Sequence, residues 1–122
     1  MIRMGERGRD DDEGMASAEL AVGLVTLLLV LSLALGAVRL GMDRATAISV
    51  AGSLAREAAR DGDTAALWSQ SVDGLPAGAR YGVARESEVV VVTVVLPVRA
   101  GPLRLALPPA TEVRATALRE AP

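Results

Sequence analysis

Residues 14–38 read GMASAELAVGLVTLLLVLSLALGAV, and this stretch decides the fold of the chain. From Leu20 to Val38 it contains no charged side chain, and Glu19 and Arg39 close the run at its two ends. As a helix the run is roughly 28 Å long, close to the ~30 Å hydrocarbon core of a bilayer. We therefore expect a transmembrane helix whose membrane span covers about residues 20–38.

The apolar run has two other interpretations. A buried helix of a soluble domain needs a surrounding core, and a chain of 122 residues has too little material to wrap a helix that is apolar on every side. A secretory signal peptide usually has an apolar region of about 7–15 residues behind a positively charged start. Here the run is longer, and residues 1–14 carry a net charge of −2. The small residues of Ala34-Leu35-Gly36 leave signal-peptide cleavage as an alternative.

The composition of the chain argues against catalysis, metal binding and nucleic-acid binding. The chain has no Cys and no His, which removes thiolate nucleophiles, disulfides and the usual ligands of zinc or copper. Trp68 and Tyr81 are its two aromatic residues, and its arginines are scattered, so a nucleic-acid surface is not expected. The acidic run Asp10–Glu13 is interpreted as solvated charge rather than a metal site. We predict no catalytic residue, no cofactor, no metal and no small-molecule substrate, and hence no enzyme.

The helix is expected to extend well beyond the apolar run. Residues 1–14 have little apolar content and are interpreted as a solvated tail. The helix should begin near Ala16 or Ser17, where Ser17 can cap its first turn. It meets no breaker before Asp61, and Gly62 suits a left-handed cap. Residues 15–61 are thus predicted to form one continuous helix, about half of which projects beyond a bilayer.

Small residues recur along one face of the projecting part of this helix. Such spacing allows two helix backbones to approach closely, although Ala also favours helices for its own propensity. The presence of Gly, which propensity alone disfavours, favours close packing. The predicted packing residues are Ala37, Gly41, Ala45, Ser49 and Gly52, with Ala55 and Ala59 continuing the stripe.

Residues 62–78 are predicted to form a linker with a short helix from Thr64 to about Ser71, capped by Asp63. From residue 79 the pattern changes to that of strands. VVVVTVVLPV is the strongest strand signal, and its continuous apolar character suggests burial on both faces, by the helix and by a partner subunit. The predicted fold class is α+β: a long N-terminal transmembrane and packing helix, then a three-stranded antiparallel head over 79–122. The expected strands are Arg80–Arg85, Val89–Val98 and Thr111–Arg119.

The sequence Gly14-Met15-Ala16-Ser17-Ala18-Glu19, directly before an apolar span, resembles the processing site of type IV prepilins. The phrase SAELAV and the later AREAAR look like the TadE-like minor pilins or pseudopilins of tight-adherence (Flp-type) pilus systems, in an actinobacterial composition. The resemblance covers residues 14 to about 60. It implies that a membrane-embedded prepilin peptidase cuts between Gly14 and Met15, and that Glu19 becomes the fifth residue of the mature chain.

The resemblance also implies a role for Glu19 and a topology. The amine freed at Met15, on the same chain or on a neighbouring subunit, would pair with Glu19 and register subunits during assembly. The alternative is a carboxylate that simply sits at headgroup level near the start of the helix. Residues 1–14 would be a cytoplasmic leader and the head would be outside, in a single-pass protein of the cytoplasmic membrane that later reaches the pilus or cell surface. The implied partners are the membrane, the peptidase, other pilin subunits and the assembly machinery. The alternative function is an uncleaved single-pass anchor with a small extracytoplasmic binding domain.

Overall fold

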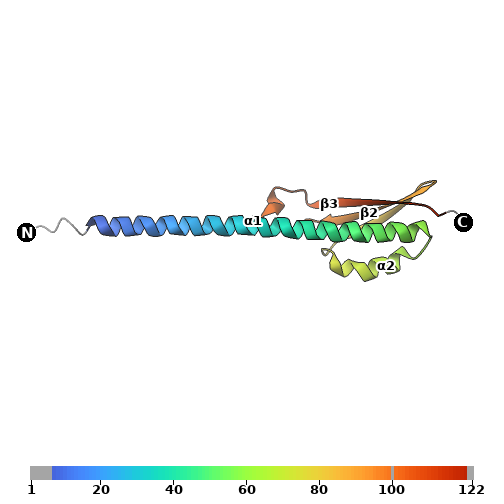
Figure 1. Cartoon of the computed structure of the whole chain (residues 1–122), viewed down its shortest axis with the longest axis horizontal. Helices are drawn as coiled ribbons and strands as arrows, with labels where there is room; N and C mark the ends of the chain where they lie inside the picture. The colour runs from blue at the N-terminus through green and yellow to red at the C-terminus, as the bar shows by residue number, and fades with distance from the viewer. Residues whose placement is uncertain (1–6, 100, 121–122) are drawn as a thin grey trace, which may run out of the picture.

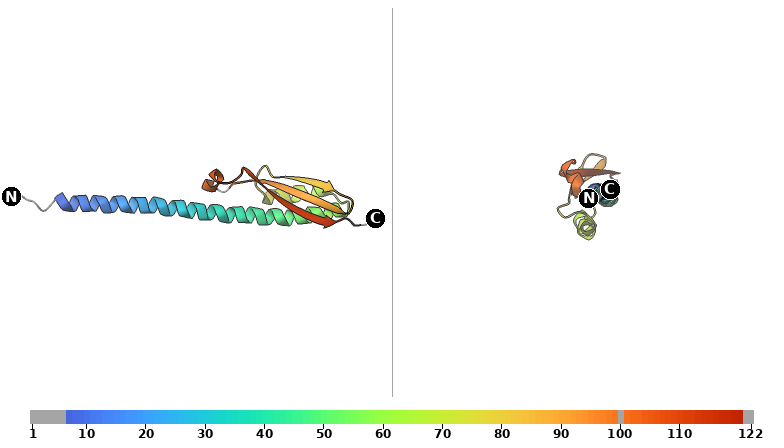
Figure 2. Two further views of the ribbon diagram at one scale, coloured as in Figure 1. Left: turned by 90° about the horizontal axis from the view of Figure 1, so that it is seen from above. Right: turned by 90° about the vertical axis from the view of Figure 1, so that its left-hand side faces the viewer.

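The structure is a computed structural model that describes residues 7–99 and 101–120. One long helix, α1, runs the length of the molecule, and a small sheet and a second helix pack around its C-terminal part (Figures 1 and 2). This layout confirms the predicted α+β fold class. The elements in chain order are α1 (Arg7–Ala59), α2 (Thr64–Ser71), the 3₁₀ helix η1 (Val72–Gly74), β1 (Arg80–Arg85), β2 (Val89–Pro97), the 3₁₀ helix η2 (Gly101–Leu105) and β3 (Ala110–Leu118).

Helix α1 begins earlier than the sequence suggested. The predicted start near Ala16 or Ser17 was wrong, because the helix already includes Arg7 and is 53 residues long. Acidic side chains near the start of a helix favour its dipole, and no proline interrupts the stretch. Gly14 costs about 1 kcal/mol inside a helix, which a long helix tolerates because elongation needs no new nucleus. Residues 1–6 of the predicted leader lie outside the described residues.

The end of α1 uses a different residue from the one predicted. Asp61, not Gly62, adopts the left-handed conformation, with φ of 54°. The Asp61 amide donates to the Ala58 carbonyl (3.2 Å) and the Gly62 amide donates to the Glu57 carbonyl (2.9 Å), which is the bonding pattern of a Schellman cap. A Cβ at position 62 would meet the Glu57 side chain, a flexible and partly exposed group that can move aside. The helix therefore ends at Ala59, two residues before the predicted Asp61.

Helix α2 covers the predicted residues. The Asp63 carboxylate caps it by accepting a hydrogen bond from the Ala66 amide at 3.0 Å. Trp68 of α2 lies against Tyr81 of β1, with ring centroids 4.7 Å apart. Leu67 and Trp68 both pack on the core, so the short helix closes one side of the head.

The sheet is an antiparallel meander in the order β1-β2-β3, and all three strands lie within one residue of their predicted bounds. In β2, buried and half-buried residues alternate along the strand. Val113, Ala115 and Ala117 of β3 pair with Val94, Val92 and Val90, so these three residues form the inner face of the last strand. The last two residues of the predicted head, 121–122, are not among the described residues.

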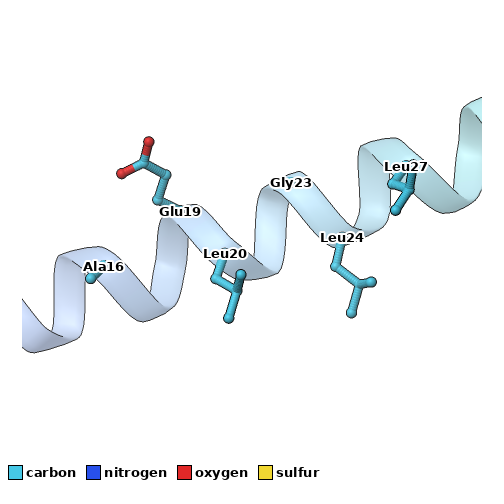
Figure 3. A pocket seen from close by; sticks show the side chains of 6 residues that line it. All are labelled: Ala16, Glu19, Leu20, Gly23, Leu24 and Leu27. Atoms are coloured by element: carbon cyan, nitrogen blue, oxygen red, sulfur yellow. The ribbon is translucent and has the colours of Figure 1, made fainter.

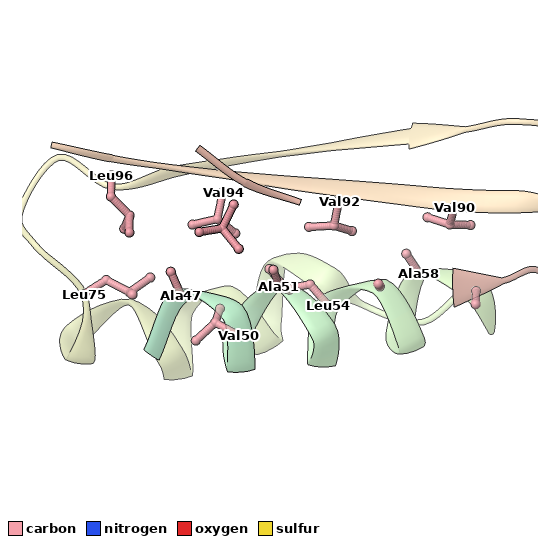
Figure 4. Packing of buried hydrophobic residues seen from close by; sticks show 13 residues of the cluster. Ala47, Val50, Ala51, Leu54, Ala58, Leu75, Val90, Val92, Val94 and Leu96 are labelled. Atoms are coloured by element: carbon pink, nitrogen blue, oxygen red, sulfur yellow. The ribbon is translucent and has the colours of Figure 1, made fainter. Parts of the chain in front are cut away.

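The hydrophobic core lies between β2 and the last turns of α1 (Figure 4). Small side chains on the helix let the sheet approach closely, and the valines of β2 fill the space between them. The prediction that β2 is buried on both faces is correct within this chain for one face only; Val91, Thr93 and Val95 on the other face are half-buried. The fully buried residues include Ala47, Ala51, Leu54 and Ala58 of α1 and Val90, Val92 and Val94 of β2.

Candidate functional site

The N-terminal part of α1 presents an apolar surface that the head does not cover. Between Leu20 and Val38, every Leu and Val except Leu33 is 52% to 76% exposed. The helix reaches a mean hydropathy of 2.6 over 18 residues, which makes it long and apolar enough to cross a membrane. Exposed apolar surface of this extent marks a membrane or a protein interaction site. The predicted transmembrane character of the helix is supported to that extent.

Glu19 lies at the N-terminal edge of this exposed apolar surface. It is the charged residue to which the resemblance to pilins assigns a role. It borders a shallow groove with Ala16, Leu20, Gly23, Leu24 and Leu27. Its carboxylate points away from Leu20 and Leu24, so the acid and the leucines project from different sides of α1 (Figure 3). Among the side chains of residues 11–99 and 101–120, no cation pairs with Glu19. The geometry leaves the carboxylate accessible to a partner from outside the chain.

Gly14 and Met15 lie inside α1, and both are exposed. A side chain added at Gly14 would meet no atom within 4 Å, and Met15 is 71% exposed. Met15 and Glu19 are four residues apart and therefore lie on one face of the helix. An amine created at Met15 would be a neighbour of Glu19 on the same chain, which is compatible with the predicted pairing.

The predicted packing stripe divides into an open part and a covered part. Ala37, Gly41, Ala45 and Ser49 are exposed, and a Cβ at Gly41 would meet nothing within 4 Å. Gly52 is half-buried next to the Arg56 side chain. Ala55 and Ala59, which continue the stripe in the sequence, belong to the core beneath the sheet. The head of the same chain thus occupies the end of the stripe and leaves its first four positions accessible.

Sequence reasoning missed one contact between the head and the exposed helix. The Arg99 guanidinium donates two hydrogen bonds of 3.2 Å to the Asp43 carboxylate, from Nε and from Nη2. These hydrogen bonds raise the pKa of Arg99 above its ordinary value. They attach the chain after β2 to α1, and η2 follows along the same helix. No local sequence signal predicts a pair between residues separated by 56 positions in the chain.

No protein-family model, curated protein or solved structure matches this chain. Across the part of the chain that the structure describes, no three His, Cys, Asp or Glu side chains are grouped as metal ligands. The exposed features of the described chain are an apolar helix, an accessible carboxylate and an open stripe of small residues. Such features are suited to binding.

Proposed function

We propose that this chain is a TadE-like minor pilin or pseudopilin in the assembly of a type IV-related (Flp/Tad) pilus. The observation that carries the proposal is the exposure of one helix that bears, in order, an accessible Gly14-Met15 bond, Glu19 and an uncovered apolar surface. In the precursor, lipid would cover this surface. After cleavage, the same surface would pack against the helices of neighbouring subunits.

The head is built in a way that suits such a change of surroundings. The hydrophobic core of the head lies on the C-terminal turns of α1, from Ala47 onward, and its members include no residue of the apolar run. Transfer of residues 20–38 from lipid to a protein interface would therefore leave the packing of the core intact. The exposed positions Ala37, Gly41, Ala45 and Ser49 provide a face on which another helix can approach closely.

Cleavage after Gly14 is the step that most directly tests the proposal. A peptidase needs an extended backbone, and Gly14 lowers the local cost of unwinding the helix because glycine is a poor helix former. We expect the protein extracted from membranes of cells with an active prepilin peptidase to begin at Met15. Intact mass spectrometry measures this directly, and a chain that begins at Met1 or Ile2 in such cells would contradict the proposal.

Gly14→Arg is the matching variant. The structure has room for the new side chain, since a Cβ at position 14 meets nothing within 4 Å. We expect normal abundance, an uncleaved chain and loss of pilus assembly. The same substitution at Gly8, six residues earlier in the same helix, adds the same charge and should leave cleavage unchanged. Equal cleavage of both variants would show that Gly14 is not part of a processing site.

The pairing of Glu19 with a freed amine is tested separately. Glu19→Gln removes the charge and keeps the size of the side chain. We expect it to be cleaved and membrane-bound but not to enter the assembled pilus. If Glu19→Gln assembles as the unchanged protein does, Glu19 is only a carboxylate at headgroup level.

Two observations favour the alternative of an uncleaved anchor with a binding head. α1 crosses Gly14-Met15 without a break, and the outer face of β2 offers the half-buried Val91 and Val95 as a contact surface. For this alternative, Gly14→Arg would keep full function. Val91→Asp, which leaves the inner face of the sheet untouched, would abolish binding of the envelope partner.

A further inference from the structure

The 3₁₀ helix η2 lies beside the middle of α1, away from the three-stranded sheet (Figures 1 and 2). The faces of α1 differ in solvent exposure in this region. Ser32, Leu33 and Leu40 are half-buried and Gly36 is buried, while Leu31, Leu35 and Val38 are more than half exposed. The four covered positions follow helical spacing, so they mark the face of α1 on which η2 packs. This face includes part of the apolar run, residues 20–38.

The position of η2 conflicts with a bilayer that contains only α1. From Leu20 to Ser32 a helix rises roughly 18 Å, well short of the ~30 Å hydrocarbon core. To keep η2 outside the core, the bilayer would have to thin by roughly 12 Å, or the span would have to extend back over about eight residues. That extension would bring Glu19, Glu13 and Asp12 into the hydrocarbon, where a charge near the centre is costly.

Segment 101–109, GPLRLALPP, has the composition of a segment that lipid accepts. Its only charged residue is Arg104, and Leu105 is 95% exposed although it lies beside a helix that should be surrounded by lipid. Three of its residues are prolines, which have no backbone N–H to satisfy. The Ala106 amide donates to the Leu103 carbonyl, and the Val98 amide donates to the Pro109 carbonyl, each at 3.0 Å. One amide and two carbonyls of the segment are therefore bonded within the chain.

Two arginines lie where the segment would meet the headgroups. Arg99 and Arg104 line a shallow hollow of about 520 Å³ together with Pro97, Leu107 and Pro109. Arg104 is exposed and forms no ion pair with the residues that the structure describes. A long arginine side chain can keep its charge at the headgroup level while its stem lies in apolar surroundings. Arg99 is paired with Asp43, so Arg104 is the residue of the hollow that offers positive charge to lipid phosphates.

We propose that segment 101–109 is a membrane-inserted wedge: η2 enters the leaflet on the head side beside α1, with Leu105 in contact with acyl chains. The occupant of this surface is lipid rather than a second copy of the chain, because η2 lies beside the apolar run that lipid must surround. The inference rests on the proposed placement of α1 in a bilayer. It is independent of cleavage after Gly14.

Depth-dependent fluorescence quenching tests the wedge. Trp68 is the only tryptophan, so Trp68→Phe provides a background in which a single tryptophan reports one position. The full chain is reconstituted in vesicles of phosphatidylcholine and phosphatidylglycerol with bromines on the acyl chains. Leu105→Trp reports the wedge, and Leu118→Trp is its matched control, an exposed leucine (77%) at the far end of the head. Leu28→Trp, 55% exposed, reports α1 itself.

We expect Leu28→Trp and Leu105→Trp to lose roughly half of their emission or more, because an inserted apolar segment reaches the acyl boundary. Leu118→Trp should lose little. Quenching at position 28 without quenching at position 105 overturns the wedge and keeps the membrane helix. Absence of quenching at both positions overturns both. A blue-shifted Leu105→Trp that lipid bromines do not quench, with a shift that grows with protein concentration, would assign the surface to a second copy and also overturn the wedge.

Thiol accessibility gives a second measurement that does not depend on a large side chain. The chain has no cysteine, so Leu105→Cys and Leu118→Cys each introduce a single thiol. A membrane-impermeant maleimide, added to vesicles in which the head faces outward, should modify position 118 quickly and position 105 slowly. Detergent should remove the difference. Equal rates in intact vesicles would overturn the proposal.

Discussion

Residues 20–38 and residues 47–59 belong to the same helix, the first rich in Leu and Val and the second rich in Ala, and they have different surroundings. In the first stretch large apolar side chains point in every direction, and the head covers only the η2 side. In the second stretch polar residues such as Ser49, Arg56 and Glu57 occupy one side, and the apolar side is buried under the sheet. The arrangement of polar residues around the helix, rather than total hydrophobicity, decides which part can hold a folded head and which part requires lipid or other helices.

The largest expected effect tests the buried half. Leu54 is fully buried, so Leu54→Ala should lower the free energy of unfolding of the head by about 2–5 kcal/mol. Urea unfolding of the full chain in detergent, followed by Trp68 fluorescence, measures this change. Leu28→Ala is the matched control in the exposed half and should leave the transition unchanged. Equal destabilisation by both changes would mean that the two halves do not differ as described.

A charge in the exposed half should act on membrane insertion instead of on folding. Leu28→Asp places a carboxylate near the centre of the apolar run, where insertion is disfavoured by about 2.5–3.5 kcal/mol. We expect a smaller alkali-resistant membrane fraction. Leu118→Asp adds the same charge to the head and should not alter this fraction. If the Leu28→Asp chain stays in the membrane as well as the unchanged protein does, residues 20–38 are not the span.

Enlarging a small residue distinguishes the two faces of the helix. Ala51 is fully buried against the sheet, and overpacking by Ala51→Leu should lower the free energy of unfolding by about 1–3 kcal/mol. Ala45→Leu makes the same change six residues earlier, at an exposed position, and should leave the unfolding transition unchanged. If the open stripe packs against other subunits, Ala45→Leu will instead reduce assembly. Normal assembly with Ala45→Leu would remove Ala45 from the packing surface.

The smallest expected effect concerns the connection between the two regions. Arg99→Gln removes the ion pair with Asp43 and should shift the urea midpoint only slightly, because exposed ion pairs contribute little to stability. The shift should shrink further in high salt, which screens such pairs. A large, salt-independent shift would show that the Arg99–Asp43 contact holds the head on the helix and does not merely orient η2.

Local signals predicted much of the fold. Strand bounds, the Asp63 cap and α2 followed from turn residues and β-branched runs, because these features depend on neighbours in the chain. The start of α1 was predicted too late because residues 1–14, which are charged and show no hydrophobic periodicity, were interpreted as a solvated tail. No residue type in this stretch stops a helix. The left-handed residue was assigned to Gly62 because glycine is the usual choice, while the structure uses Asp61.

Some features of the candidate site could likewise be predicted from the sequence, and others could not. Gly14, Glu19 and the apolar run were visible in the sequence because their meaning lies in linear order. The Asp43–Arg99 pair and the position of η2 beside the middle of α1 were not visible, because they depend on how the chain returns after β2 to a helix formed much earlier. The division of the small-residue stripe into an open and a covered part was equally inaccessible, since helical spacing alone does not show which positions the sheet will occupy.

The sequence by itself determined that the chain has one long helix with an apolar half and a small three-stranded sheet behind it. Periodicity, β-branching and turn chemistry act between near neighbours, so they can be recognised without a structure. Only the tertiary structure decided which residues of the helix carry the head, which face of β2 is buried and where η2 lies. Those features arise from packing between segments distant in the chain, and a linear pattern does not contain the distances between them.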